Sequence, residues 1–278
     1  MEALLIIQAR IGGTRFPRKV LAHILGQPML LWQLDRLRVL QGTARIVVAV
    51  PHGQEQHPIR DLCQRHGYAC LAAPKDIAED DVLGRYASVL SRDRDRLDTI
   101  VRITADCPLI DPVLVREMIA YHHYGKASTY QLQSCIKSPF DHTGIAAEWP
   151  DGQDVEVCRR DVLLAVENDT ILDSPDREHV TPGIWRHPDR FQCATYPCTM
   201  DLSRYQCSVD TPEDLLLVSG IMEWCLERYG FQFGWREIWW CFQCNPHFRA
   251  MMEQRAPRNH AYVAQVGAAT WEAARYAQ

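Results

Sequence analysis

The sequence has no apolar run approaching the roughly 20 residues that a membrane-spanning helix requires, and its amino terminus lacks the regions of a signal peptide. It also lacks a basic excess, because 30 lysine and arginine residues stand against 35 aspartate and glutamate residues, for a formal net charge of −5. Proteins that bind nucleic acid usually carry such an excess. We therefore expect a cytoplasmic protein with neither a membrane nor a nucleic-acid partner.

Cysteine patterns typical of metal sites or disulfides are also missing. The count of eleven is odd, and a chain of 278 residues without a secretory signal is an unfavourable case for a disulfide framework. Cys241-Phe-Gln-Cys244 is a single CxxC without the second pair or the histidines of a structural zinc site, so buried free thiols are the simpler interpretation. Internal repeats and low-complexity segments are absent as well, and the length fits one large α/β domain or two smaller ones.

A basic loop with two glycines follows an apolar segment near the amino terminus. Residues 4–7 read Leu-Leu-Ile-Ile, which is typical of a buried strand in a parallel sheet. Residues 9–19 then read Ala-Arg-Ile-Gly-Gly-Thr-Arg-Phe-Pro-Arg-Lys. Glycines allow backbone N–H groups to approach an anion closely, and the cations oppose the charge of a triphosphate. The residues concerned are Gly12, Gly13, Arg10, Arg15 and Lys19.

The familiar phosphate-binding loops do not account for this sequence. A dinucleotide-binding loop requires G-x-G-x-x-G and a P-loop requires G-x-x-x-x-G-K-[ST], and two adjacent glycines followed by Thr14 satisfy neither. Pro17 also opposes a long helix beginning at Gly12. The alternative is a glycine turn whose cations are simply solvated.

Apolar segments alternate along the chain as in a doubly wound α/β sheet. The spacing predicts helices at about 29–40, 59–66, 82–90 and 212–229, and strands at 46–50, 68–72 and 99–104. The last strand delivers Asp106 to the same carboxyl edge as the basic loop, which is where open α/β sheets bind ligands. The alternation weakens over 127–196, which we interpret as an insertion. We therefore predict a mostly parallel, Rossmann-like sheet in a domain over 1–234, followed by a helical extension over 235–278.

Five further motifs follow the basic loop along the chain. They are Asp80-Asp-Val-Leu-Gly-Arg-Tyr86, Val101-Arg-Ile-Thr-Ala-Asp-Cys-Pro-Leu-Ile-Asp-Pro112, Asp151-Gly-Gln-Asp-Val-Glu156, Arg177-Glu-His-Val-Thr-Pro182 and Val209-Asp-Thr-Pro-Glu-Asp-Leu215. Together with the basic loop, these six motifs in this order resemble the bacterial cytidylyltransferases, most closely the spore-coat polysaccharide biosynthesis branch that is related to the CMP-KDO and CMP-sialic acid synthetases.

This resemblance implies an α/β nucleotidyltransferase fold and transfer of CMP from CTP to an acidic sugar or related acceptor for surface polysaccharide or glycan biosynthesis, with release of pyrophosphate. It implies Mg²⁺ held by Asp106 and Asp210, since Mg²⁺ bridges phosphate oxygens and is bound by carboxylates. Arg15 and Lys19 would join these two aspartates as catalytic residues. Taken singly, Asp106 fits a turn residue equally well, and Asp210 a helix cap. The nucleotide-binding residues would be Gln8, Ala9, Arg10, Gly12, Gly13, Thr14, Arg15, Lys19, Arg102, Thr104 and Asp106.

The resemblance also implies that the insertion covers the acceptor pocket and pairs two subunits into a homodimer. The acceptor-binding residues would be Asp154, Glu156, Arg177, Glu178 and His179. From the residues alone, Asp154 and Glu156 would share one side of a strand, either as acceptor ligands or as a solvated face. The triplet 177–179 fits an acceptor-binding segment or a polar helix entry.

The sequence departs from the family pattern in three places. Arg18 stands where many relatives have glycine, and Ala105 replaces a common glycine. The segment Leu71-Ala-Ala-Pro74 lacks a usual arginine–glycine pair, and this last departure would change base or acceptor contacts. Two other functions stay open. One is a nucleotidyltransferase that uses a sugar 1-phosphate or a non-sugar phosphate or phosphonate, and the other is a noncatalytic nucleotide-binding scaffold protein.

Overall fold

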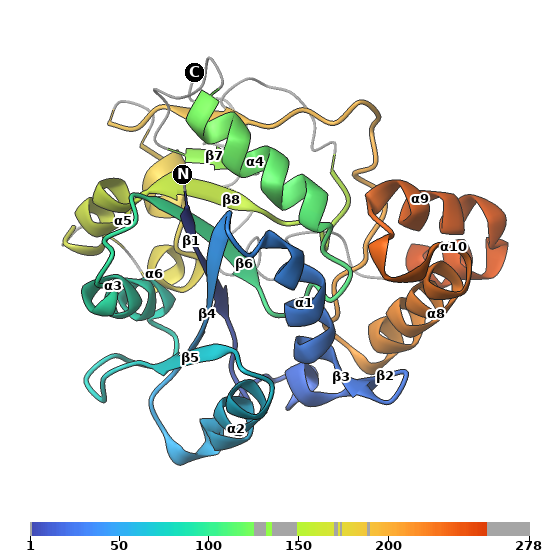
Figure 1. The fold of residues 1–278 in the computed structure, drawn as a ribbon, viewed down its shortest axis with the longest axis horizontal. Helices are drawn as coiled ribbons and strands as arrows, with labels where there is room; N and C mark the ends of the chain where they lie inside the picture. The colour runs from blue at the N-terminus through green and yellow to red at the C-terminus, as the bar shows by residue number, and fades with distance from the viewer. Residues whose placement is uncertain are drawn as a thin grey trace.

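The computed structural model describes residues 2–124, 132–134, 149–169, 172, 174–187 and 190–254. Its centre is a seven-stranded sheet in the order β5-β4-β1-β6-β8-β7-β9 (Figure 1). The strands are β1 (Ala3–Gln8), β4 (Ala44–Val50), β5 (Ala69–Ala72), β6 (Thr99–Thr104), β7 (Leu132–Ser134), β8 (Glu156–Arg159) and β9 (Cys193–Thr195). A separate antiparallel pair consists of β2 (His23–Ile24) and β3 (Gln27–Pro28).

Helices flank the sheet and extend past one of its ends. They are α1 (Met29–Leu37), α2 (His57–Arg65), α3 (Val82–Arg92), α4 (Pro112–Tyr124), α5 (Arg160–Glu167), α6 (Ser174–His179), α7 (Pro182–Trp185), α8 (Pro212–Tyr229), α9 (Trp235–Cys244) and α10 (Pro246–Glu253). Short 3-10 helices occur at η1 (Lys19–Leu21), η2 (Arg38–Leu40), η3 (Gln54–Gln56) and η5 (Gly230–Gln232).

The four strands β5, β4, β1 and β6 are parallel, and β1 lies between β4 and β6. Chain order reverses at β1, so the loops that follow β1 and β6 leave the same carboxyl edge side by side. This is the topological switch point where open α/β sheets bind ligands. The predicted doubly wound, mostly parallel sheet is confirmed.

Both faces of the sheet are covered, which explains why β1 is apolar from Ala3 to Ile7. Leu5 and Ile7 belong to the larger core with α1, α2, α4 and α8. Leu4 and Ile6 point to the other face and pack with α3, α5 and α7. Figure 1 shows α3 and α5 on one side of the sheet and α1 and α4 on the other. Period-2 alternation of the two faces therefore requires an apolar residue at every position.

The described part of the insertion extends the same sheet. The strand β8 pairs antiparallel with β6, and β7 pairs antiparallel with β8 and parallel with β9. The expected dimer contact concerns a segment of which 127–131, 135–148, 170–171, 173 and 188–189 lie outside the described residues.

The carboxyl-terminal helices α8, α9 and α10 form a group next to α1 in Figure 1. The buried Arg36 of α1 donates from Nε to Ile110 O at 3.1 Å and from Nη2 to Phe233 O at 2.7 Å. The backbone N–H of Trp235 donates to Asp111 Oδ2 at 3.0 Å. The start of the predicted helical extension is therefore part of the main core, while 255–278 lie outside the described residues. Within the part of the chain that the structure describes, no helix is both long and apolar enough to cross a membrane.

Candidate active site

The basic loop after β1 folds back on itself and delivers Lys19 to the sheet edge. The backbone N–H of Arg18 donates to Ile11 O at 3.0 Å, and the N–H of Ile11 donates to Gln56 Oε1 at 3.0 Å. Arg18 has a φ of 62°, in the left-handed region that glycine adopts without steric cost. The backbone at this position therefore favours the glycine from which the sequence departs.

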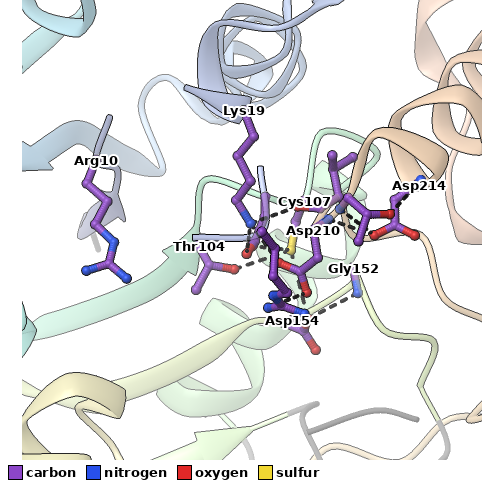
Figure 2. A network of polar contacts seen from close by, with 12 residues as sticks. Arg10, Lys19, Thr104, Cys107, Gly152, Asp154, Asp210 and Asp214 are labelled. Atoms are coloured by element: carbon purple, nitrogen blue, oxygen red, sulfur yellow. Dashed lines mark hydrogen bonds and ion pairs between the residues drawn. The ribbon is translucent and has the colours of Figure 1, made fainter. Parts of the chain in front are cut away.

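Lys19 joins two segments that are far apart in the sequence. Its Nζ lies 3.2 Å from Asp106 Oδ2, 2.8 Å from Asp210 Oδ1 and 2.8 Å from the carbonyl oxygen of Val209. The N–H of Val209 also donates to the backbone oxygen of Asp106 at 2.8 Å, which ties the turn after β6 to the segment before α8. Figure 2 shows Lys19 reaching down toward Asp210 in this network. The structure thus brings together three of the four predicted catalytic residues.

Asp210 precedes α8 without capping it. The hydroxyl of Thr211 accepts from the N–H of Asp214 at 3.3 Å, and the Asp214 carboxylate accepts from the N–H of Thr211 at 2.9 Å, which forms a capping box. The helix end is satisfied by these two residues. The side chain of Asp210 therefore points to the cations, and the helix-cap interpretation of Asp210 does not hold.

Opposite charges keep the cluster ionised. Burial alone would lower the pKa of Lys19, but the charges of Asp106 and Asp210 outweigh it and raise that pKa above its ordinary value. Burial alone would raise the pKa of Asp106, and the Lys19 ammonium instead brings it below its ordinary value. Arg15 adds a second cation, with Nη2 3.1 Å from Asp210 Oδ2. All four predicted catalytic residues thus form one ionic network.

Arg10 lies apart from this cluster (Figure 2) and has a glutamate on either side. Its guanidinium nitrogens lie 3.9 Å from Glu79 Oε1 and 3.7 Å from Glu178 Oε1. Gly12 is packed against the same Glu79, because a Cβ added to Gly12 would meet Glu79 Oε1 at 2.4 Å. Sequence reasoning missed Glu79, since an exposed loop carboxylate carries no pattern. Glu178, which was expected to bind the acceptor, contacts Arg10 of the basic loop.

The remaining loop residues differ in exposure. Gly12, Gly13 and Thr14 are exposed, while Ala9 is buried and its N–H donates to Ala49 O at 3.0 Å. The oxygen Oε1 of Gln8 is buried and has no hydrogen-bond partner among the described residues. An unpaired buried amide oxygen where the basic loop begins fits a contact with a ligand.

Asp154 and Thr104 border the cluster through Cys107. The sulfur of Cys107 lies 3.3 Å from Thr104 Oγ1, 3.5 Å from Asp106 Oδ1 and 3.8 Å from Asp154 Oδ2. Asp154 Oδ2 also accepts from the N–H of Gly152 at 3.1 Å. Burial and the neighbouring carboxylates raise the pKa of Cys107 well above its ordinary value, which disfavours the thiolate form that a nucleophile requires. Asp154 thus lies close to Asp106, because both carboxylates contact the Cys107 sulfur.

Arg102 and Glu156 differ from the expectation that they contact nucleotide and acceptor. They are opposite each other in the β6–β8 register and form an ion pair, with only 8% and 3% of each residue exposed. The other oxygen of Glu156 accepts from Thr181 Oγ1 at 2.7 Å. The charges satisfy each other inside the protein because antiparallel pairing places them side by side.

Arg177 connects two of the motifs. Its Nε and Nη2 donate to Asp81 Oδ1 and Oδ2 at 2.9 and 3.0 Å. Asp81 caps α3, accepting from the N–H of Gly84 at 3.0 Å. Arg177 therefore anchors α6 to the start of α3 in the described structure, whereas acceptor contact had been expected. His179 lies at the end of α6 and is partly buried.

The cluster provides oxygen donors suited to Mg²⁺. Asp106 and Asp210 already contact one cation, the Lys19 ammonium group. Carboxylate oxygens are also the ligands that Mg²⁺ prefers. The described residues contain no group of three or more histidine, cysteine, aspartate or glutamate side chains able to hold a metal ion. Mg²⁺ is usually bound through one or two carboxylates together with substrate phosphates, so a metal held by these two aspartates would take its further oxygens from a substrate. Every cysteine in the described ranges is a free thiol, including Cys241 and Cys244.

Known proteins resemble this chain in sequence. A family model described as cytidylyltransferase matches residues 4–216. The spore coat polysaccharide biosynthesis protein SpsF of Bacillus subtilis is 27% identical over 234 residues, which cover 82% of this chain and 89% of that protein. A 3-deoxy-manno-octulosonate cytidylyltransferase of Polynucleobacter asymbioticus is 30% identical over 148 residues, covering 52% of this chain and 56% of the relative.

Solved structures share the fold. A cytidylyltransferase from Leptospira borgpetersenii superposes with a TM-score of 0.74 at 21% identity, over 92% of this chain and 98% of the other. A CMP:2-keto-3-deoxy-manno-octonic acid synthetase complexed with CTP gives a TM-score of 0.57 at 18% identity, over 80% of this chain and 99% of the other. At these identities the likeness concerns the fold alone.

Proposed function

The chain belongs to the cytidylyltransferase family, and from that premise we propose that it transfers CMP from CTP to a hydroxyl group of an acidic sugar, with release of pyrophosphate. The observation that carries the proposal is the meeting of Lys19 with Asp106 and Asp210 at the carboxyl edge of the sheet. This network combines a cation for a polyphosphate with carboxylates for a metal. The relative named a 3-deoxy-manno-octulosonate cytidylyltransferase supports a sugar acid as the acceptor. The relative named a spore coat polysaccharide biosynthesis protein supports a role in surface polysaccharide biosynthesis.

In the proposed reaction, an acceptor hydroxyl oxygen attacks the α-phosphorus of CTP. The new oxygen–phosphorus bond forms as the bond to the oxygen of the β-phosphate breaks, and the hydroxyl proton is released. Lys19 and Arg15 bind the β- and γ-phosphates, and Arg10 joins them from the other side of the loop. Positioning and electrostatic stabilisation supply most of the catalysis.

Asp106 and Asp210 would hold Mg²⁺ in this proposal. When bound, the ion supplies charge neutralisation for the triphosphate. The unpaired Oε1 of Gln8 and the exposed backbone of Gly12 and Gly13 would receive the nucleotide. Asp154 would orient an acceptor hydroxyl next to Asp106, because both carboxylates contact the Cys107 sulfur.

The direct test is a thermal-shift titration with CTP, ATP, GTP and UTP, each with and without Mg²⁺. We expect the largest stabilisation from CTP with Mg²⁺, and equal shifts from all four nucleotides would contradict the base assignment. Pyrophosphate release is then measured with CTP and an acceptor panel. Sugar acids should be active, whereas activity only with sugar 1-phosphates or phosphonates would assign a different nucleotidyltransferase. Nucleotide binding without release for any acceptor would instead support the scaffold function.

A further inference from the structure

The ammonium group of Lys19 occupies a compact oxygen cage. Two carboxylate oxygens and the Val209 carbonyl oxygen lie 2.8 to 3.2 Å from Nζ, and they come from the turn after β6 and the segment before α8. Figure 2 shows the side chains of Lys19 and Asp210 meeting in this network. Three convergent oxygens, two of them charged, form a cation site that the protein fills with its own side chain.

Lys19 is the inner of the two cations at this site. Its side chain is 23% exposed and contacts both aspartates, whereas that of Arg15 is 51% exposed and contacts Asp210 alone. Without Lys19, the like charges of Asp106 and Asp210 would face each other with only the outer Arg15 as compensation. Such a pair repels at short range and attracts any available cation.

A divalent metal and Lys19 would compete for the same oxygens. Mg²⁺ usually binds through one or two carboxylates together with substrate phosphates, rather than in a cage made entirely of protein groups. The described ranges agree with that pattern, because they contain no cluster of three or more metal-ligating side chains. Two things are therefore required before a metal binds Asp106 and Asp210. The metal needs additional oxygen ligands, and Lys19 needs a new anionic partner. A triphosphate supplies both.

We propose that Lys19 holds the place of the divalent cation between Asp106 and Asp210, and that it yields this place only when a nucleoside triphosphate offers the ammonium other oxygens. The inference rests on the proposed function of this site. Metal and nucleotide then bind together, each raising the affinity for the other by the same factor. Lys19 consequently has two roles. It binds phosphate oxygens when nucleotide is present, and it occupies the carboxylates of Asp106 and Asp210 when nucleotide is absent, which prevents a metal from binding there.

The test measures Mn²⁺ binding to the nucleotide-free protein by electron paramagnetic resonance. Three proteins are compared, the wild type, Lys19→Met and the control Lys75→Met, which removes an exposed lysine of the same charge. We expect Lys19→Met to bind Mn²⁺ at least about tenfold more tightly than the wild type, since two close carboxylates lose their competing cation. Lys75→Met should match the wild type. An affinity of Lys19→Met within twofold of the wild type would overturn the proposal.

Folding of the variants gives a second readout. In EDTA, Lys19→Met should melt below the wild type because of the repulsion between its aspartates, and Mn²⁺ should raise its melting temperature more than that of the wild type. Lys19→Gln, which keeps hydrogen-bond donors without the charge, should show the same direction if Lys19→Met does not fold. Equal Mn²⁺ shifts in the wild type and Lys19→Gln would contradict the inference.

The wild type separates this inference from the proposed function. Calorimetry with Mg²⁺ and CTP in the absence of acceptor tests whether the nucleotide binds at all, and lack of binding would refute the proposed function. If CTP binds but wild-type protein holds Mn²⁺ equally tightly with and without CTP, after correction for Mn²⁺ bound to free CTP, only the role of Lys19 as a placeholder is refuted.

Discussion

Removing the carboxylate of Glu156 is expected to destabilise the protein rather than to weaken acceptor binding. Glu156→Ala would leave the Arg102 guanidinium buried and unpaired, with 8% of that residue exposed, and would remove the partner of the Thr181 hydroxyl. Breaking a buried ion pair by removing one partner costs about 3–5 kcal/mol. We expect a loss of that size in the free energy of unfolding.

Urea-induced unfolding followed by circular dichroism measures this loss. The exposed Glu117→Ala on α4 is the control and should lie within about 0.5 kcal/mol of the wild type. The double variant Arg102→Met with Glu156→Leu should recover most of the stability, because neither charge is then buried alone. If Glu156→Ala unfolds at the wild-type urea concentration while its KM for the acceptor rises, Glu156 is an acceptor ligand and the structural role is wrong.

Three further outcomes are expected. Arg18→Gly should be about 1 kcal/mol more stable than Arg18→Ala, because the φ of 62° is a left-handed conformation that costs residues with a Cβ; equal thermal melting of the two variants would contradict this. Glu79→Gln should bind CTP about twofold to fivefold more tightly in calorimetry, since an exposed carboxylate no longer competes for Arg10; unchanged affinity would remove Glu79 from the site. Light scattering should give twice the 31.9 kDa mass of one chain, because two-fold dimers are the commonest oligomers, and a concentration-independent mass of one chain would refute the predicted homodimer.

The proximity of Lys19 and Asp106 could be predicted because the topology of the sheet decides which loops share an edge. The apolar strands β1 and β6 are recognisable from composition, and parallel neighbours place the loops after them at one edge. Lys19 and Asp106 therefore meet for a reason that is visible in the sequence. Asp210 was added by the motif resemblance, and the capping box of Thr211 and Asp214 explains why its side chain is available to the cations.

Residues whose roles depend on a specific partner were not predictable in the same way. Alternation along a strand indicates which face of the sheet Arg102 and Glu156 each point to. The antiparallel register that pairs the two residues is not encoded in any local pattern. The sequence likewise shows only that Arg177 is a charged residue. Its partner, the Asp81 carboxylate that caps α3, becomes apparent once the position of α6 is known. These roles depend on contacts between residues that are far apart in the sequence. The local spacing of residue types does not indicate such contacts.

The most direct test of the proposed active centre is the rate of pyrophosphate release by Asp106→Asn with saturating CTP, Mg²⁺ and a verified acceptor. Asp106→Asn keeps the shape of the side chain and removes the charge that Lys19 contacts. Asp61→Asn, an exposed position on α2, is the control and should retain wild-type turnover. We expect Asp106→Asn to lower turnover by a factor of about 10²–10³, as does the loss of other groups that stabilise charge at an active site. Turnover within about threefold of the wild type, far short of that magnitude, would show that the reaction centre lies elsewhere.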